Sequence, residues 1–384
     1  MSSSHSVQAL FQPFTAGKLT LPNRIVMAPM TRTFSPGGVP GPDVAAYYRR
    51  RAENGVGLIV TEGTAINHPA ASSDPRVPNF HGEKALSGWS QIVGAVHEAG
   101  GRIIPRLWHV GIQRRPGSEP NPEAPPISPS GLALTGEQVG EPMTEAEIGA
   151  VIEAYAQGAA DAKRLGFDGI ELHGAHGYLI DEFFWGATNR RTDRYGGDLV
   201  ARTRFAVEVI EACRRATGPD FPIVLRFSQW KSDAYTAKLA ETPDELARFL
   251  APLVDAGIDI FHCSTRRFWE PEFEGSDLNL AGWTKKLTGR PVITVGSVGL
   301  DTEFISLFTE GKLPKSTGID GLLERLEREE FDLVAVGRAS AGGSRVGDQD
   351  PGGPGGRAEA FYPGSTADPG VSRCCPVDRE GILA

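Results

Sequence analysis

The sequence contains few cysteines and no long apolar run. Its four cysteines, Cys213, Cys263, Cys374 and Cys375, form no Cys-x-x-Cys motif, so neither a disulfide framework nor an iron–sulfur or zinc site is supported. No 18 uninterrupted apolar residues occur, and the Ser-rich residues 1–8 contain no apolar segment. Neither membrane insertion nor export is therefore expected, and a reducing, cytoplasmic location is.

The chain also lacks an excess of positive charge. Its 39 Lys and Arg against 48 Asp and Glu give a net charge of −9. This balance argues against a nucleic-acid or anionic-membrane partner, so a bound phosphate would need a local site. With 384 residues, 40% of them hydrophobic, the chain can form one large domain or two ordinary ones.

Eight apolar segments alternate with helical patterns. The expected strands cover 24–31, 57–63, 102–109, a fourth ending at 169–170, 222–228, 258–264, 291–296 and 331–338. The expected helices cover 43–55, 86–99, 144–166, 198–217 and 242–257. Continuously apolar strands are buried on both faces, which predicts an α/β fold, a parallel (β/α)8 TIM barrel, with an open eight-stranded sheet as the alternative. The Pro- and Gly-rich residues 110–142 are expected to form a lid or pocket wall.

Three groups that can move protons lie within six residues in the middle of the chain. His173, His176 and Tyr178 follow the apolar pair 169–170, and Gly174 and Gly177 allow the backbone to turn between them. A histidine beside a strand can be a hydrogen-bonded core residue, and His-x-x-His can be half of a metal site. The third interpretation is a pair that binds an anion or a carbonyl oxygen.

In a parallel barrel, function collects at the carboxyl-terminal ends of the strands, here called the mouth. Arg226 has no carboxylate neighbour in the sequence, which predicts a positive charge aimed into the mouth. Gly296 and Gly337 can expose backbone N–H groups to a phosphate that Arg338 would neutralise. No conventional nucleophile, metal triad or Gly-x-Gly-x-x-Gly accompanies these residues, so a bound cofactor is expected to carry the electron chemistry.

Several of these motifs together resemble the Old Yellow Enzyme family of FMN-dependent ene-reductases. The likeness runs from about residue 10 to 339 in the same order, and the stretch from 171 to 178 is its most specific part. The motifs are Met-Ala-Pro-Met-Thr at 27–31, Leu-Trp-His-Val-Gly at 107–111, Glu-Leu-His-Gly-Ala-His-Gly-Tyr at 171–178, Asn-Arg-Arg-Thr-Asp-Arg-Tyr-Gly-Gly at 189–197 and Gly-Arg at 337–338.

This resemblance implies a barrel that binds FMN, accepts electrons from NADPH or NADH and passes hydride from flavin N5 to the C=C bond of an activated alkene. Trp108 would line the substrate pocket, His173 and His176 would bind the substrate carbonyl oxygen, and Tyr178 would protonate the α-carbon. The residues expected to contact FMN are Pro29, Met30, Thr31, Gly63, Arg106, Arg226, Gly296, Ser297, Gly337 and Arg338.

Arg106 departs from the family pattern, which usually has Gln at this position. Arginine has donors only, so it could contact a flavin carbonyl but could not accept from the ring N–H. We expect the second positive charge to raise the flavin reduction potential.

The second departure follows residue 339, where the family continues with a final amphipathic helix. Residues 340–384 instead contain ten Gly and five Pro, a composition of linkers and disorder. A natural tail and a changed reading frame both account for the abrupt change. The expected organisation is a flexible arm at 1–9, a barrel at 10–339 and a tail at 340–384 that leaves one flank of the barrel uncovered.

The sequence leaves two alternatives to an ene-reductase open. One is a flavin-binding barrel impaired by the missing helix, and the other is a metal-dependent barrel hydrolase that uses His173 and His176. A small-molecule alkene is the expected partner, and the protein is expected to be a monomer or a homodimer.

Overall fold

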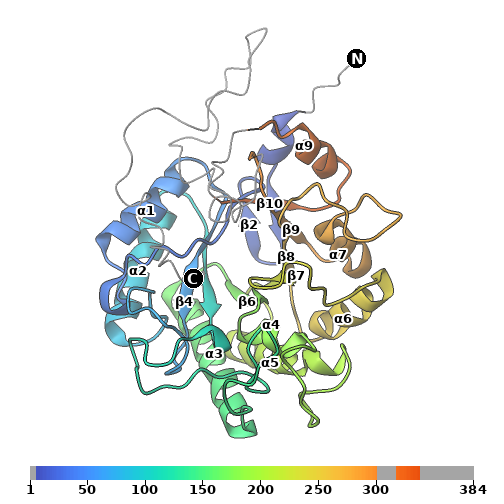
Figure 1. Ribbon diagram of the computed structural model, residues 1–384. Coiled ribbons are helices and arrows are strands. Elements are labelled where there is room, and N and C mark those ends of the chain that lie inside the picture. Colours follow the sequence, from blue (N-terminus) through green and yellow to red (C-terminus); the bar gives the residue numbers. More distant parts are fainter. Residues whose placement is uncertain (1–5, 301–316, 338–384) are drawn as a thin grey trace.

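The computed structural model describes residues 6–300 and 317–337, and its parallel strands close into a barrel (Figure 1). Strand β10 pairs with β3, with Val336 opposite Met27, and thereby closes the ring. This closure confirms the predicted TIM barrel and rules out the open sheet. In ring order the strands are β10 (Leu333–Val336), β3 (Ile25–Met27), β4 (Leu58–Ala65), β5 (Ile103–Trp108), β6 (Ile170–His176), β7 (Ile223–Lys231), β8 (Ile260–Ser264) and β9 (Val292–Val295).

Helices surround the strands on the outside of the barrel (Figure 1). Their apolar faces and the outward faces of the strands form one large buried cluster that includes Tyr48, Trp89 and Phe205. The described helices are α1 (Pro42–Glu53), α2 (Glu83–Glu98), α3 (Glu145–Leu165), α4 (Leu179–Phe184), α5 (Arg204–Thr217), α6 (Pro243–Asp255), α7 (Leu280–Thr288) and α9 (Asp320–Glu327), with short 3-10 turns η1 (Val7–Phe11), η2 (Pro36–Gly38), η3 (Gly111–Gln113) and η4 (Ala201–Thr203).

Local signals set several helix ends. A capping box forms at Thr144, because its hydroxyl accepts from the Glu147 N–H while the Glu147 carboxylate accepts from the Thr144 N–H. The Thr242 hydroxyl caps α6, but the Glu245 carboxylate accepts from the Glu241 N–H and not from that of Thr242, so no complete box forms there. Gly41 is the N-cap of α1, and Asp43 lies in its first turn.

The predicted end of the fourth strand was wrong. Strand β6 continues past residues 169–170 through the whole histidine motif, because Ile170 to Gly174 pair with β7 and His176 pairs with Lys231 after an irregularity in register. The turn comes only at Gly177, which has a φ of 79°. Polar side chains therefore project from a paired strand and not from a loop.

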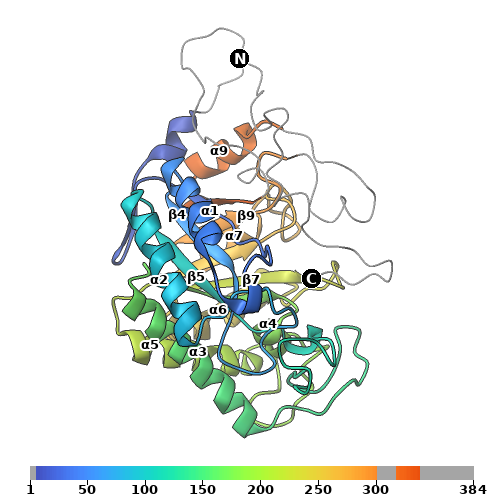
Figure 2. The ribbon, with the colours of Figure 1, turned by 90° about the vertical axis from the view of Figure 1, so that its left-hand side faces the viewer.

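A small apolar cluster fills the amino-terminal half of the barrel interior. The antiparallel hairpin of β1 (Phe14–Ala16) and β2 (Leu19–Leu21) closes this end, with Phe14, Leu19 and Leu21 packed against the inward side chains of the strands. Figure 2 shows the hairpin at one end of the barrel and α4 at the other. The hairpin was not predicted from the sequence, because strands of three residues show no periodicity.

The expected domain limits, an arm at 1–9 and a tail at 340–384, can be compared with the described residues only in part. Residues 7–9 of the predicted arm lie in η1, whose N-cap is Ser6 and whose Leu10 is buried. The predicted tail at 340–384 lies outside the described residues. The domain limits therefore stay predictions.

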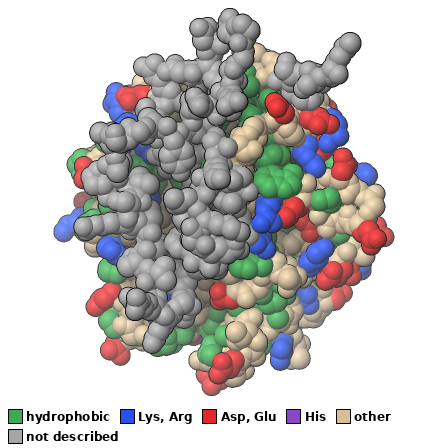
Figure 3. Space-filling model, turned by 45° about the horizontal axis from the view of Figure 1, so that its top comes forward, with side chains coloured by type: hydrophobic (Ala, Val, Ile, Leu, Met, Phe, Trp, Pro, Cys, Tyr) green, Lys and Arg blue, Asp and Glu red, His purple; other side chains and the backbone are tan. Residues whose placement is uncertain are grey.

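Two features of the described residues bear on the expected partners, namely the helices and the charges on one face. None of the helices in these ranges is long and apolar enough to span a membrane. On the face shown in Figure 3, the described acidic and basic side chains are interspersed.

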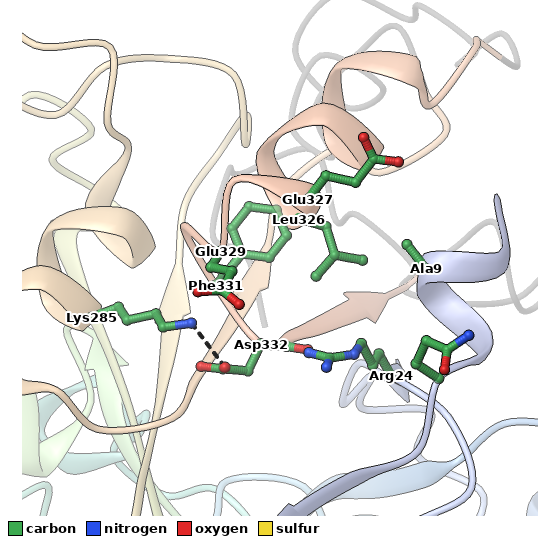
Figure 4. A pocket seen from close by; sticks show the side chains of 9 residues that line it. Ala9, Arg24, Lys285, Leu326, Glu327, Glu329, Phe331 and Asp332 are labelled. Carbon is green, nitrogen blue, oxygen red and sulfur yellow. Dashed lines mark hydrogen bonds and ion pairs between the residues drawn. The ribbon is translucent and has the colours of Figure 1, made fainter. Parts of the chain in front are cut away.

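A cavity of about 190 Å³ lies at the amino-terminal end of the barrel (Figure 4). Its walls include Arg24 and Asp332, which directly precede β3 and β10, and Lys285 of α7, whose Nζ lies 2.9 Å from Asp332 Oδ1. It is therefore at the opposite end from the mouth.

Candidate active site

The side chains of the candidate site continue the inward faces of the strands. Ile104, Val224 and Ile260 belong to the apolar cluster inside the barrel. Successive inward side chains of a strand are two residues apart, so Arg106, Arg226 and His262 lie one step closer to the mouth. Glu171 and His173 of β6 join them, with His173 in register with Arg226 and Arg226 with His262. We call these five residues the polar layer.

Three members of the polar layer form a buried charge network. The Arg106 Nε donates to Glu171 Oε1 at 2.8 Å, and His262 Nδ1 lies 2.5 Å from Glu171 Oε2. Burial would raise the pKa of Glu171, but the positive charge of Arg106 and the contact with His262 outweigh it and lower that pKa to about 2. Burial lowers the pKa of His262 to about 4, despite the opposing charge of Glu171. At neutral pH, Glu171 is therefore charged and His262 neutral.

The network changes the interpretation of Arg106. The sequence suggested a second free positive charge, whereas Glu171 offsets that charge at close range. The Arg106 Nη2 nevertheless has no partner among the described residues and is buried. Arg106 can therefore donate to one more acceptor in the mouth.

Arg226 is buried in the polar layer, and its role toward a cofactor stays a prediction. Its Nη2 donates to Ser264 Oγ at 3.0 Å, while its buried Nε and Nη1 have no partner within the described ranges. Burial and the nearby charge of Arg106 lower the pKa of Arg226 to about 9, and Glu171 opposes this shift. The guanidinium stays charged at neutral pH, with the N–H groups of two nitrogens, Nε and Nη1, available to a ligand.

The three residues of the central motif come together at the mouth. The His173 ring centroid lies 5.1 Å from that of His176 and 5.0 Å from that of Tyr178, and Trp108 packs edge-on against Tyr178 at 5.0 Å. The His173 Nδ1 is buried without a partner in the described part of the chain.

Both imidazoles of the motif are neutral at neutral pH. Burial lowers the pKa of each well below its usual value, with the charge of Arg106 adding at His173 and that of Arg226 at His176. Neutral imidazole N–H groups can hydrogen-bond an oxygen without carrying a charge of their own.

The loop at 110–142 packs against this motif, as expected for a pocket wall. The Gln113 amide donates to the Gly177 carbonyl at 2.8 Å. A Cβ at Gly177 would approach Leu134 to 2.7 Å, so the glycine allows the loop to lie this close. The long loop is therefore one wall of the mouth.

The residues expected to contact a cofactor lie around the same end of the barrel. Pro29, Met30 and Thr31 follow β3, and Thr31 is exposed. A Cβ at Gly63 in β4 would lie 2.4 Å from the Trp108 ring, so only a glycine at this position leaves room for the indole.

The glycines expected at the phosphate end occupy neighbouring strand ends. Gly296, with a φ of 150°, would meet Thr265 Oγ1 at 2.5 Å if it carried a Cβ. Ser297 follows it, and Gly337 follows β10, where a Cβ would lie 3.9 Å from the Cβ of Ala28. Arg338 lies outside the described residues.

Sequence reasoning missed the partners that hold this site. Glu171, Trp230, His262 and Ser264 were not assigned roles, although Glu171, Trp230 and Ser264 contact predicted site residues and His262 contacts Glu171. The alternation of Phe261 and Cys263 with His262 and Ser264 in β8 was a usable signal, because polar residues on one face of a buried strand need a reason.

The metal-site interpretation lacks a ligand set. No group of three His, Cys, Asp or Glu residues within 6–300 and 317–337 is placed to hold a metal ion. The His173 and His176 pair therefore has no third ligand in the described structure.

Comparisons with known proteins identify the family. Residues 9–313 match the model of the NADH:flavin oxidoreductase / NADH oxidase family. The chain is 41% identical to 12-oxophytodienoate reductase 7 of Oryza sativa subsp. japonica over 55% of this chain and 56% of that protein. It is 32% identical to the putative 12-oxophytodienoate reductase 2 of the same plant, over 84% of this chain and 90% of that protein.

Solved structures agree with these relatives. The structure of morphinone reductase superposes with a TM-score of 0.72 at 29% identity, covering 94% of this chain and 96% of that chain. The residue motifs, the closed barrel and these matches all lead to one assignment. The chain belongs to the NADH:flavin oxidoreductase / NADH oxidase family, which is the Old Yellow Enzyme family, and is an NAD(P)H-dependent FMN oxidoreductase.

Proposed function

We propose that this protein reduces the C=C bond of activated alkenes, in particular α,β-unsaturated carbonyl compounds. The observation that carries the proposal is the convergence of two neutral imidazoles, His173 and His176, with the Tyr178 phenol at one point of the mouth. Two neutral donors suit a carbonyl oxygen that gains negative charge, and a nearby phenol suits proton delivery to the adjacent carbon.

The residues of the mouth fit FMN. The unpartnered N–H groups of Arg226 and Arg106 are suited to the carbonyl oxygens and ring nitrogens on the pyrimidine side of the flavin. Pro29, Met30, Thr31 and Gly63 would line the ring. The strand ends at Gly296, Ser297 and Gly337, together with Arg338, would hold the phosphate. When bound, FMN supplies the hydride, which it receives from NADPH or NADH.

The histidines bind and polarise the substrate in this proposal. Hydride addition to the β-carbon moves negative charge onto the carbonyl oxygen, and N–H groups of His173 and His176 stabilise that charge. In other oxyanion sites, loss of one such donor costs about 2.7–4 kcal/mol. The positive charges of Arg106 and Arg226 contribute by keeping both imidazoles neutral, so that each retains a nitrogen able to accept as well as one that donates.

Tyr178 protonates the α-carbon in this proposal, and buried contacts hold it in place. It is the N-cap residue of α4, directly after Gly177. The Gly177 N–H donates to Asp181 Oδ2 at 2.7 Å, and the other oxygen of Asp181 forms a 2.8 Å ion pair with the fully buried Lys231. This pair ties the turn that carries the phenol to β7, which limits its movement relative to the histidines.

The names of the relatives support the proposal. The matched rice proteins and the superposed structure are called 12-oxophytodienoate reductase and morphinone reductase, so each is a reductase of an organic small molecule. The segment from 110 to 142 differs from the barrel in having little regular structure and forms a wall of the mouth. We propose that it contributes to the choice of alkene.

The function can be tested by anaerobic titration of the purified FMN-loaded protein with NADPH, followed by 2-cyclohexenone. We expect NADPH to bleach the flavin absorbance, and the enone to restore it with formation of cyclohexanone. A flavin that NADPH reduces but the enone does not reoxidise would support the impaired-barrel alternative. Activity that a chelator abolishes would contradict the proposed chemistry.

A further inference from the structure

Ser264 lies at the end of β8 and touches two groups of the candidate site. Its Oγ is 3.0 Å from Arg226 Nη2 and 2.8 Å from His176 Nε2. The side chain is buried, with an exposed fraction of 2%. We propose that Ser264 is a positioning residue that fixes the tautomer of His176, so that Nδ1 carries the hydrogen offered to the substrate oxygen. This inference rests on the proposed function only in naming that oxygen.

Counting donors and acceptors at the hydroxyl gives the tautomer. Arginine can only donate, so the Arg226 contact occupies a lone pair of Ser264 Oγ. The hydroxyl has one hydrogen, and the remaining contact of Oγ in the described structure is with His176 Nε2. If Nε2 also carried a hydrogen, the buried hydroxyl hydrogen would have no acceptor, which buried polar groups avoid. Nε2 is therefore the acceptor.

A neutral imidazole carries one N–H, so an accepting Nε2 places that hydrogen on Nδ1. The ring is neutral because burial, with the charge of Arg226 adding to it, lowers the pKa of His176 well below its usual value. Nδ1 has no protein partner in the described ranges and is not among the fully enclosed unpartnered atoms. It is the ring atom left to contact a ligand.

The ring is also held against rotation. The Trp230 indole stacks on it, with centroids 4.6 Å apart and planes inclined by 24°, and donates its own N–H to the Ser264 carbonyl at 3.0 Å. A 180° turn of the ring about its Cβ–Cγ bond would put a carbon, Cε1, in the place of Nε2 and break the Ser264 contact. Ser264 and Trp230 thus hold one edge and one face of the same imidazole.

The backbone of His176 is fixed as well. Its φ of 68° is uncommon for a residue other than glycine, and such a conformation persists only where the surroundings determine it. Here the His176 N–H donates to Ser228 Oγ at 3.1 Å, and the His176 carbonyl accepts from Ser232 Oγ at 3.0 Å. The direction of Nδ1 is therefore set by the protein before substrate arrives.

The tautomer matters because the other one would reverse the interaction. With hydrogen on Nε2, Nδ1 would present a lone pair to the carbonyl oxygen, and two acceptors repel each other. A serine that only accepts from Nε2–H would therefore weaken substrate binding. Ser264 accordingly determines whether Nδ1 donates to the substrate oxygen or repels it, and Trp230 determines where the ring lies.

The test is ¹⁵N NMR of the FMN-loaded protein with labelled histidine, without any alkene present. The His176 signals are identified by their loss in His176→Asn. We expect Nδ1 of His176 to be protonated and Nε2 unprotonated in the wild type, and this pattern to be lost or mixed in Ser264→Ala. Ser264→Thr keeps the hydroxyl and should restore it. Ser228→Ala is the control, because the Ser228 hydroxyl contacts the His176 N–H and the Trp230 carbonyl but not the imidazole, and it should leave the tautomer unchanged.

Kinetics provide the second readout. In Ser264→Ala, we expect KM for 2-cyclohexenone to rise about tenfold, which corresponds to the loss of roughly one net hydrogen bond, and in Ser264→Thr we expect KM to stay near that of the wild type. A wild-type His176 protonated at Nε2 would overturn the inference, and this result does not depend on whether a Ser264 variant folds. An unchanged tautomer in Ser264→Ala would overturn it as well. An Nδ1–H tautomer in a protein that does not reduce the enone would instead contradict the proposed function and leave the tautomer assignment standing.

Discussion

The two halves of the barrel interior are built from the same strands but differ in chemistry. In the amino-terminal half, side chains such as Ile104 and Val224 pack against each other and against the β1–β2 hairpin. Two residues further along the same strands, Arg106 and Arg226 are buried with N–H groups that lack partners in the described structure. The side chains of the amino-terminal half pack against one another, whereas the polar layer leaves N–H donors that can bind a ligand.

The fold must compensate for the free-energy cost of burying unpartnered polar atoms at the site. Buried polar atoms without partners destabilise a protein, each by about 1–3 kcal/mol. The polar layer has several, namely Arg106 Nη2, the Nε and Nη1 of Arg226, His173 Nδ1 and His262 Nε2. The apolar half below them, closed by the hairpin, is the part of the interior that offsets this cost.

Glu171→Gln should produce the largest change in stability. It leaves Arg106 and Arg226 buried without their counter-charge, and breaking a buried ion pair from one side costs about 3–5 kcal/mol. Urea denaturation measures the free energy of unfolding. The double variant Glu171→Gln/Arg106→Gln should recover part of the loss, because it removes the unpaired charge with its partner. A loss in the double variant equal to the sum of the losses in Glu171→Gln and Arg106→Gln would show that the pair is not coupled.

Ile104→Ala tests the apolar half. We expect a loss of about 2–5 kcal/mol in the free energy of unfolding, because the side chain is fully buried and leaves a cavity. FMN affinity should stay near that of the wild type, since Ile104 lies one inward step below the mouth. A parallel fall in FMN affinity would mean that the two halves do not act separately.

Arg226→Met should affect the ligand more than the fold. The unpartnered N–H groups predict that FMN binds about 10- to 100-fold more weakly, which corresponds to about 1.5–3 kcal/mol for hydrogen bonds to a charged group. Recovery of FMN fluorescence on dilution measures the affinity, and Arg226→Lys is the control that keeps the charge.

Arg106→Gln provides the comparison for the flavin reduction potential. We expect it to lower the potential, because a positive charge is removed near the flavin. The shift should be smaller than in Arg226→Met, because loss of Arg106 raises the pKa of the buried Glu171, and a proton taken up by Glu171 replaces part of the lost positive charge. A spectroelectrochemical midpoint that does not change in either variant would contradict the assigned charges.

Acidification should lower the stability of the folded protein. Burial keeps the pKa of His262 at about 4 in the folded protein, below its usual 6.5, so the unfolded chain binds the proton more readily between these values. Stability is therefore full above about pH 6.5 and decreases as pH falls toward 4. Glu171, with its pKa lowered to about 2, adds a further loss below its usual 4.5. Thermal unfolding followed across this range should show no increase in stability on acidification.

The sequence predicted the barrel and most of the site because those features are local. Each strand was a continuous apolar run, and His173, His176 and Tyr178 lie within six residues. The partners were not predictable in the same way, since His262 meets Glu171 across 91 positions and only strand register brings them together. Likewise, no local pattern separates a free Arg106 from one paired to the next strand.

The measurement that tests the account most directly is anaerobic rapid mixing of the NADPH-reduced protein with 2-cyclohexenone, for the wild type and Tyr178→Phe. We expect NADPH to reduce the flavin at similar rates in both. Reoxidation by the enone should be about 10²- to 10⁴-fold slower in Tyr178→Phe, because the proton donor is lost while the carbonyl donors His173 and His176 remain. Equal reoxidation rates, or no reoxidation of the wild type, would contradict a mouth built to add hydride and a proton to an activated alkene.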